Sequence, residues 1–173
     1  MVSVVLSHVI GTIALLLVFV SAVTYSSMSY SLLGNQVVNY NLEKISGHIV
    51  SEVTDIVSLC STSGEDQMLV KALEVPEDVT GIRYMISITV KEDRLTISSV
   101  RVANNNVFGV APLPWSSGGS VKPFNGTDPG IGISWVTPKL SVVSSAGGLA
   151  VWCLKKGSTF TFGLGVMNVT GGA

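Results

Sequence analysis

The chain has 173 residues, of which 47% are hydrophobic and only 12% are charged, and its formal net charge is −1. An ordinary soluble domain carries roughly 25% charged residues, so this composition excludes a chain that faces water along its whole length. The few Lys and Arg residues are scattered, which excludes a basic face for nucleic acid. The length suffices for an N-terminal segment and one globular domain of about 120 residues with its own core.

The first 42 residues contain no Asp, Glu, Lys or Arg, and the first charged residue is Glu43. Within this charge-free segment, residues 9–23 are almost continuously apolar. A cleaved secretory signal begins with a basic region, which is missing here, so we expect the segment to be retained in the mature chain. A simple membrane anchor carries Lys or Arg at its cytoplasmic end, and neither flank does so. A basic leader removed before Met1 and a genuine start at Met1 both fit this pattern.

Residues 1–60 have the pattern of one long helix, apolar on all sides over 1–30 and amphipathic over 31–60. In the second part the apolar positions recur every three or four residues and form one stripe: Leu42, Ile45, Ile49, Val53 and Ile56. We expect this stripe to pack against a globular β domain formed by residues 61–173. A helix of this length spans about 90 Å, roughly twice a bilayer with its headgroups, so it does not lie in a membrane throughout.

The periodicity changes to two in the remaining part of the chain. Residues 82–90 alternate between apolar and polar, Glu92 and Asp93 fit a reversal, and 95–100 form a second strand, which together predict a β-hairpin with one buried face. Residues 103–130 are rich in Asn, Pro, Ser and Gly and are predicted to be a loop. Further strands are predicted near 131–136, 139–144, 149–154 and 159–166. The expected fold class is α+β, a long helix followed by a small antiparallel β-sandwich of six or seven strands.

Two cysteines occur, Cys60 at the predicted end of the helix and Cys153 in a predicted strand. In an extracytoplasmic domain, an even pair far apart in sequence favours one disulfide, and two buried free thiols are the alternative. A bond that closes a loop of about 90 residues would stabilise the fold by roughly 4 to 5 kcal/mol in the chain-entropy model.

No set of residues suggests catalysis. His8 and His48 are too far apart on one helix to share a metal ion, and each is expected to be a hydrogen-bonded structural histidine. The adjacent carboxylates at 65–66, 77–78 and 92–93 are expected to be solvated turn residues, with a calcium site as the alternative. The sequence contains neither a Cys-X-X-Cys pair nor a phosphate-binding glycine loop. We therefore expect no enzymatic activity, no cofactor and no metal.

Two tripeptides fit the acceptor pattern for N-linked glycans. Asn125 lies in the Pro- and Gly-rich region, where a glycan would be accessible, and Asn168 lies near the end of the chain. The pattern is common by chance, and an ordinary turn or strand-end asparagine is the alternative reading of each.

The whole arrangement resembles the subunits of type IV pilin-like filaments, and it is most similar to archaeal pilins and archaellins. The resemblance rests on the uncharged apolar helix, its amphipathic continuation, the small β domain, and residues 71–88 (KALEVPEDVTGIRYMISI), which look like the segment that enters the first hairpin of many archaeal pilin-like proteins. Bacterial type IV pilins carry a glutamate near the mature N-terminus, and residues 1–7 here contain no acid. That difference argues against the bacterial mode of assembly and fits the archaeal one.

The resemblance implies a membrane-inserted precursor that a prepilin peptidase cuts after a basic leader and that assembly machinery builds into an extracellular surface filament, with adhesion as the expected role. The partners would be identical subunits in a helical homopolymer. A helix that is apolar on every side needs partners on every side, which neighbouring helices in a filament core supply. The residues expected to form this core are Val9, Ile10, Ile13, Leu15, Leu16, Leu17, Val18, Phe19 and Val20.

Two other classes compete with this reading. The chain also resembles membrane-anchored accessory proteins of the archaellum stator type, which combine one transmembrane helix with an extracytoplasmic β-sandwich. Such an anchor needs only about 20 apolar residues, so the long stripe from Leu42 to Cys60 favours the filament, unless the stripe docks on its own β domain. A secreted enzyme or lectin is the third class, and the lack of a convergent polar site counts against it.

Overall fold

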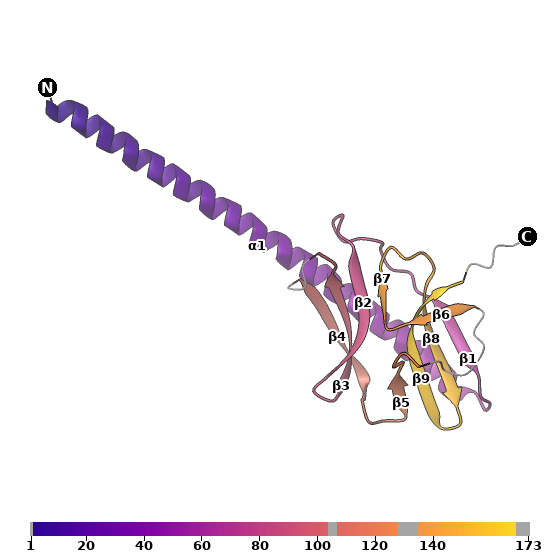
Figure 1. Cartoon of the computed structure of the whole chain (residues 1–173). Helices are drawn as coiled ribbons and strands as arrows, with labels where there is room; N and C mark the ends of the chain where they lie inside the picture. The colour runs from indigo at the N-terminus through magenta and orange to yellow at the C-terminus, as the bar shows by residue number, and fades with distance from the viewer. Residues whose placement is uncertain (1, 104–106, 128–134, 169–173) are drawn as a thin grey trace, which may run out of the picture. The chain divides into compact units, whose positions relative to one another are not determined.

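The computed structural model describes residues 2–103, 107–127 and 135–168, with side chains from residue 8 onward. The fold is α+β, as predicted: one long helix, α1 (Val2–Thr62), precedes nine strands in the described part of the chain. The chain divides into two compact units, Met1–Val37 and Val38–Ala173, which we call unit 1 and unit 2. Unit 1 consists of the first part of α1, and unit 2 contains the rest of α1 and all the strands (Figure 1).

The helix ends close to the predicted position, but the boundary between the compact units does not coincide with its end. We predicted domains at 1–60 and 61–173, whereas the division falls between Val37 and Val38. The reason is that the amphipathic part of α1 belongs to the core of unit 2. Its buried apolar side chains recur at helical spacing from the first residue of unit 2 to the last turn: Val38, Leu42, Ile45, Ile49, Val53, Ile56, Val57 and Cys60.

One sheet of unit 2 has four strands in the order β4 (Phe108–Ser116), β3 (Arg94–Arg101), β2 (Tyr84–Lys91) and β7 (Ser141–Val143). The β2–β3 pair is the predicted hairpin, with Tyr84 opposite Arg101 and Lys91 opposite Arg94. Its turn is formed by Glu92 and Asp93, whose φ angles are 51° and 61°. Two successive positive φ angles are typical of the tight turns that match the twist of a hairpin.

The second sheet has five strands. β1 (Met68–Ala72), β8 (Leu149–Lys156) and β9 (Thr159–Met167) are neighbours in that order, and β9 then pairs with both β5 (Val121–Pro123) and β6 (Val136–Lys139). The β5–β9 pairing is parallel, so the sheet is mixed and not purely antiparallel as predicted. The predicted strand near 131–136 falls largely on residues outside the described part of the chain, where β6 begins at Val136.

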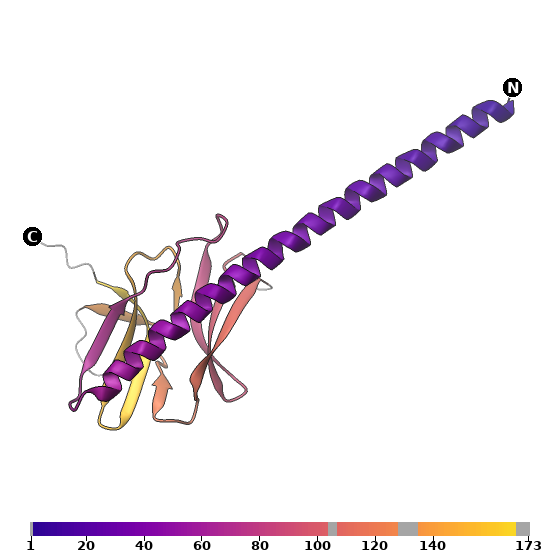
Figure 2. The same cartoon turned by 180° about the vertical axis from the view of Figure 1, so that it is seen from behind.

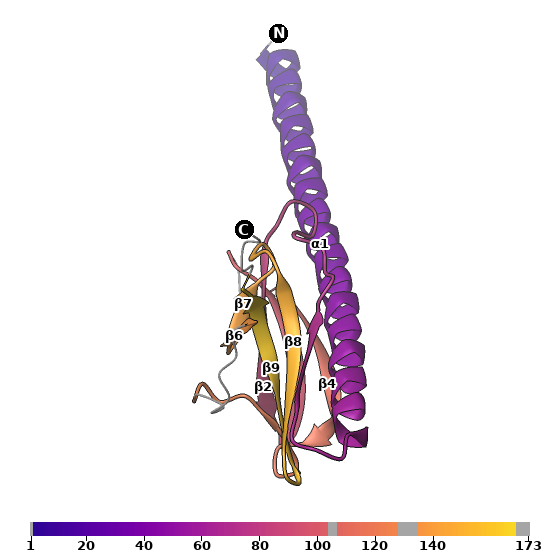
Figure 3. The ribbon, with the colours of Figure 1, turned by 90° about the vertical axis from the view of Figure 1, so that its right-hand side faces the viewer.

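The core of unit 2 lies between the inner faces of the two sheets and the buried stripe of α1. Ile86 and Ile97 from the four-stranded sheet and Val151 and Leu164 from the other belong to the same apolar cluster as the helix stripe. In Figures 2 and 3 the C-terminal part of α1 runs along one side of the two sheets. The helix therefore covers the apolar core on that side of the two sheets.

A smaller apolar cluster covers the other face of the five-stranded sheet. Trp152 is fully buried there, and its indole N–H donates a hydrogen bond of 2.9 Å to the backbone oxygen of Leu164. The ring lies across β9 at Gly163, where a Cβ atom would come within 2.7 Å of it, and Phe124 packs edge-on at 5.4 Å between ring centroids. Glycine at this strand position is required because any side chain would occupy the space of the indole.

Strand β4 runs through a region that we predicted to be a loop, and that prediction was wrong. Pro112 and Pro114 suggested irregular structure, but they lie in a strand at the edge of its sheet, where one row of N–H groups has no partner strand. The N–H of Phe108 points to this free edge and donates to the side-chain oxygen of Asn39 on α1 at 2.9 Å. Because N–H directions alternate along a strand, Pro112 stands at a position whose N–H would also face the free edge.

Candidate assembly surface and modification sites

The apolar residues of unit 1 are exposed around the full circumference of the helix. Leu15, Leu16, Leu17, Val18, Phe19 and Val20 are consecutive, and between 54% and 71% of each is exposed. Successive residues on an α-helix are separated by about 100°, so six in a row cover every direction. The remaining residues of the predicted polymerisation core, Val9, Ile10 and Ile13, are also more than half exposed. The structure thus presents an apolar cylinder with no covering side chains of its own.

Three hydroxyl groups of unit 1 bond back to the helix backbone. Thr12 donates to the backbone oxygen of His8 at 2.9 Å, Ser21 to that of Val18 at 2.8 Å, and Thr24 to that of Val20 at 2.8 Å. Such bonds satisfy each donor within the helix, so these side chains do not need water. These three polar positions are consequently suited to an apolar environment.

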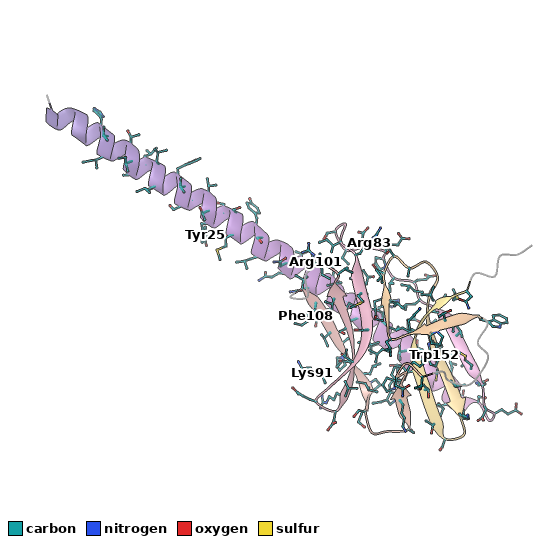
Figure 4. The ribbon with its side chains drawn as sticks, viewed as in Figure 1. Tyr25, Arg83, Lys91, Arg101, Phe108 and Trp152 are labelled. Atoms are coloured by element: carbon teal, nitrogen blue, oxygen red, sulfur yellow. The ribbon has the colours of Figure 1, made fainter. Side chains whose placement is uncertain are left out.

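Tyrosine side chains follow the apolar run. Tyr25 and Tyr30 are 76% and 77% exposed, and Figure 4 shows Tyr25 projecting from the helix. The helix from His8 to Thr62 is long and apolar enough to cross a membrane by length and composition, and its most apolar stretch is not buried within the structure. A signal sequence near an N-terminus would meet the same criteria. Tyrosine is enriched where such helices pass from hydrocarbon to headgroups.

The predicted packing stripe has a different environment, because unit 2 already covers it. Leu42, Ile49 and Val53 are at most 1% exposed, and Ile45 and Ile56 are also buried. Between them Ser46 is fully buried, and its hydroxyl oxygen lies within hydrogen-bond distance of the Ser99 hydroxyl, at 2.9 Å, and of the backbone oxygen of Gly109, at 3.1 Å. On the other flank, Glu52 forms an ion pair with Lys71 of β1, and this contact raises the pKa of the lysine. The stripe is therefore used within the chain.

Cys60 and Cys153 come together in the core of unit 2. Both are completely buried, and the Sγ atom of Cys60 lies 3.8 Å from the backbone oxygen of Cys153, to which it donates a weak hydrogen bond. Burial raises the pKa of the Cys153 thiol far above its ordinary value, and the neighbouring Cys60 thiol raises it further. Both are free cysteines, so the structure does not contain the predicted disulfide, although it places the two residues side by side.

Asn125 lies in an exposed turn after β5. Its side-chain oxygen accepts hydrogen bonds from the backbone N–H of Thr127 at 3.1 Å and from the Thr127 hydroxyl at 2.6 Å. Gly126 between them has a φ of +92°, which a glycine adopts without strain. The side-chain oxygen of Asn125 is thus used as an acceptor within the turn. Its side-chain nitrogen, the atom to which a glycan would be attached, belongs to an exposed residue.

Asn168 follows the end of β9. Its side-chain oxygen accepts a hydrogen bond of 2.8 Å from the hydroxyl of Thr137, and its backbone N–H donates to Trp135 at 2.9 Å. The two residues that complete its acceptor tripeptide lie outside the described part of the chain. The two predicted glycan sites are therefore held differently: Asn125 bonds within its own tripeptide, whereas Asn168 bonds to the neighbouring strand.

Side chains suited to metal binding do not converge in residues 2–103, 107–127 and 135–168, which contain no group of three or more His, Cys, Asp or Glu residues that could hold an ion. His8 and His48 are both exposed. Two of the carboxylate pairs take part in turns or loop contacts, since Asp78 accepts from the N–H of Gly81 at 2.9 Å and Asp66 from that of Gly157 at 2.7 Å. An open groove between α1 and β4 is lined mainly by apolar and proline side chains: Val50, Thr54, Arg94, Pro112, Leu113, Pro114, Trp115 and Ser116.

Compared with protein-family models, with curated proteins and with solved structures, the chain shows no match in any of the three. Its function is therefore inferred from its own residues.

Sequence reasoning missed three residues that fasten α1 to the four-stranded sheet. Asn39 and Ser46 bond to β4 and β3, and Gly109 lets the helix backbone approach so closely that a Cβ atom would collide with Leu42 and Glu43. Ser46 offered a detectable signal, because it is a hydroxyl directly beside the apolar stripe. Gly109 offered none, since its role depends on which helix turn crosses it.

Proposed function

We propose that this protein is a structural subunit of an extracellular filament of the archaeal type IV pilus kind, polymerising through unit 1 and serving adhesion. The observation that carries the proposal is the apolar cylinder of unit 1, whose large side chains are exposed in every direction. Burying a large apolar side chain contributes roughly 1.5 to 3 kcal/mol, so this surface strongly favours an environment without water. Several neighbouring helices of identical subunits would provide that environment.

The two parts of α1 have different surroundings, and this difference supports a polymer in which the β domain stays folded. The packing stripe from Leu42 to Cys60 is internal to unit 2 and is not available to neighbours. Unit 1 has no such internal partner among the described residues. An open assembly built by unit 1 alone would leave unit 2 intact in the precursor and in the filament, with contacts that repeat from copy to copy.

A membrane stage before assembly fits the same surface. The apolar run and the tyrosines after it match the length and the interfacial chemistry of a bilayer span. In this proposal lipid holds the precursor until assembly machinery transfers it to the filament, after a prepilin peptidase has removed a leader. The exposed turn at Asn125, and also Asn168, would carry glycans on the outer surface.

The rival function is that of a membrane-anchored β-sandwich protein of the archaellum stator type. The structure removes one argument against it, because the stripe that exceeds the length of an anchor packs on the chain's own β domain. The filament reading therefore rests on the apolar circumference of unit 1 and on the lack of Lys and Arg between the apolar run and Glu43. Both readings describe a non-enzymatic protein.

The decisive experiment is negative-stain microscopy of the cell surface, combined with mass spectrometry of the mature N-terminus. The filament proposal expects filaments that contain this chain, with an N-terminus produced by peptidase cleavage. Recovery of the chain only from membranes, as a monomer or dimer, would refute the proposal and favour the stator-type anchor.

A substitution within unit 1 tests the role of the apolar cylinder. Leu16→Asp places a charge where neighbouring helices would pack, and we expect filaments to disappear while unit 2 keeps its wild-type unfolding midpoint. Leu59→Asp is the matched control, since Leu59 is also an exposed leucine on the same helix, in unit 2, at 62% against 54% for Leu16. Normal filaments from Leu16→Asp would contradict the proposal.

A further inference from the structure

Two thiols that are far apart in the sequence of unit 2 lie in contact within its core. Cys60 is in the last turn of α1, and Cys153 is in β8, which lies between β1 and β9. The residues are 93 positions apart, both are fully buried, and both belong to the main apolar cluster. Ordinary packing requires only that a cysteine fill a small apolar space. It does not require that two cysteines from distant segments meet.

We propose that Cys60 and Cys153 are joined by a disulfide that forms while unit 2 is still open, and that folding then seals this bond inside the core. The oxidant is a disulfide of an extracytoplasmic thiol oxidoreductase. One cysteine thiolate attacks that disulfide, which releases one thiol of the oxidant and leaves a mixed disulfide, and the second thiolate then displaces the other thiol. Overall, the two cysteines lose two electrons and two protons, and the oxidant disulfide becomes two thiols.

The order of events follows from the surroundings of the two sulfurs. The attacking species in thiol–disulfide exchange is the thiolate, and it must reach the oxidant directly. In the folded domain neither sulfur is accessible, and burial among apolar groups raises the pKa of the Cys153 thiol, which keeps it protonated. The folded reduced protein is therefore protected from oxidation. The bond must form before the core closes, or during a large opening of it.

The bond would add a covalent link between α1 and the five-stranded sheet, which now contact each other through apolar packing, the Glu52–Lys71 ion pair and the hydrogen bond from Cys60 to Cys153. α1 is the helix that continues into unit 1, and its last turn would be linked covalently to the middle of the five-stranded sheet. Force applied to the helix would then reach β8 directly through a covalent bond, in addition to the backbone connection from α1 to β1 and the side-chain contacts. The inference rests on the proposed function only in placing unit 2 outside the cytoplasm.

The first test counts thiols in the full chain purified in detergent, without reductant, from the membrane and surface fraction of the cells that make it. After denaturation, a maleimide reagent is expected to label no cysteine, and to label two once reductant has been added. Cys153→Ala is the control, which should label one cysteine in either condition. Two labelled cysteines in the untreated wild-type chain would overturn the proposal, whether or not filaments are seen.

The second test measures whether the folded core protects the two thiols from oxidation. Its result does not depend on where in the cell the protein is located. The full chain is reduced, folded in detergent, freed of reductant and exposed to oxidised glutathione, with and without denaturant. Oxidation in the folded state is expected to be at least about 100-fold slower than in denaturant, because it requires the core to open. Equal rates in the two conditions would overturn the proposed order of events. The same chain labelled with maleimide in the folded state supplies an independent measure of access.

Discussion

The two parts of α1 contain similar apolar residues, and these residues have opposite surroundings. In unit 2 the leucines, isoleucines and valines of the helix stripe are almost fully buried, whereas in unit 1 similar side chains are more than half exposed. The secondary structure does not change between them, since the helix runs without interruption from Val2 to Thr62. The difference lies in the distribution of apolar residues: one stripe in unit 2, and the whole circumference in unit 1.

This contrast shows that a helix can be complete as secondary structure and incomplete as tertiary structure. A single stripe is satisfied by one neighbouring surface, which unit 2 provides from its two sheets. An apolar circumference needs several neighbours, and within the described residues this chain supplies none for unit 1. If the two parts are energetically independent, a substitution in unit 1 should leave the free energy of unfolding of unit 2 unchanged.

The largest expected effect is a difference in the free energy of unfolding between two alanine substitutions on α1, one in each unit. Ile49→Ala removes methylene groups from a fully buried site and should lower the free energy of unfolding of unit 2 by about 2 to 5 kcal/mol. Leu16→Ala in unit 1 should leave it unchanged. Denaturation of the full chain in detergent, followed by tryptophan fluorescence, measures this directly, because Trp115, Trp135 and Trp152 all lie in unit 2. An equal loss from both substitutions would contradict the independence of the units.

A second pair of substitutions tests how closely α1 approaches the sheet. Gly109→Ala would drive a methyl group into the backbone of the helix at Leu42 and Glu43, and we expect a loss of about 1 to 3 kcal/mol or more. Gly47→Ala is the matched control on the solvent side of the helix, where no atom lies within 4 Å. That substitution should raise stability by about 0.5 to 1 kcal/mol, because alanine favours a helix interior. Stabilisation by Gly109→Ala would refute the close contact.

The smallest expected effect depends on pH. Burial, followed by the negative charge of Asp78, raises the pKa of Tyr84 from 10.0 to about 12. Below pH 10 the phenol is protonated in both the folded and the unfolded states and makes no pH-dependent contribution. Between pH 10 and 12 the phenol is deprotonated in the unfolded chain but still protonated in the folded one. The free energy of unfolding of unit 2 therefore falls as the pH rises through this range.

The measurement is the denaturation midpoint of unit 2 from pH 9 to 12. Tyr84→Phe removes the phenol, which donates a 2.6 Å hydrogen bond to the backbone oxygen of Pro76, and should weaken the decline at high pH. Because that variant also loses the hydrogen bond, its midpoint should be lower at pH 9. An alkaline decline identical to that of the wild type would show that Tyr84 is not responsible.

The sequence predicted the parts of the fold that depend on regular spacing. The helix, its buried stripe from Leu42 to Ile56 and the β2–β3 hairpin all follow from periods of 3.6 and two. The boundary between the two units at Val37 and Val38 was not visible in the sequence, because helical periodicity identifies the stripe but not the surface that covers it. The meeting of Cys60 with Cys153 was expected from their number, and the structure places them together without showing the bond.

Two of the strands that the sequence did not reveal break the usual rules, whereas a third, β1, was missed although it has no such feature. β4 contains two prolines, which a central strand would exclude, and β5 is a three-residue strand that pairs in parallel with β9. Such strands depend on what lies beside them: β4 on a free edge, and β5 on the neighbouring β9. The assembly role of residues 9–20 remains a prediction, since exposure identifies an unsatisfied surface but not the molecule that covers it.

The way in which β4 ends its sheet has a consequence for copies of this domain held at high density. Strand edges are where folded proteins recruit one another into aggregates, by adding strand to strand without limit. Along this edge the N–H of Phe108 is already taken by Asn39, and Pro112 and Pro114 have none to offer. A neighbouring strand would thus find too few donors for a continuous ladder. The β4 edge therefore does not support strand-to-strand association between crowded copies of the domain.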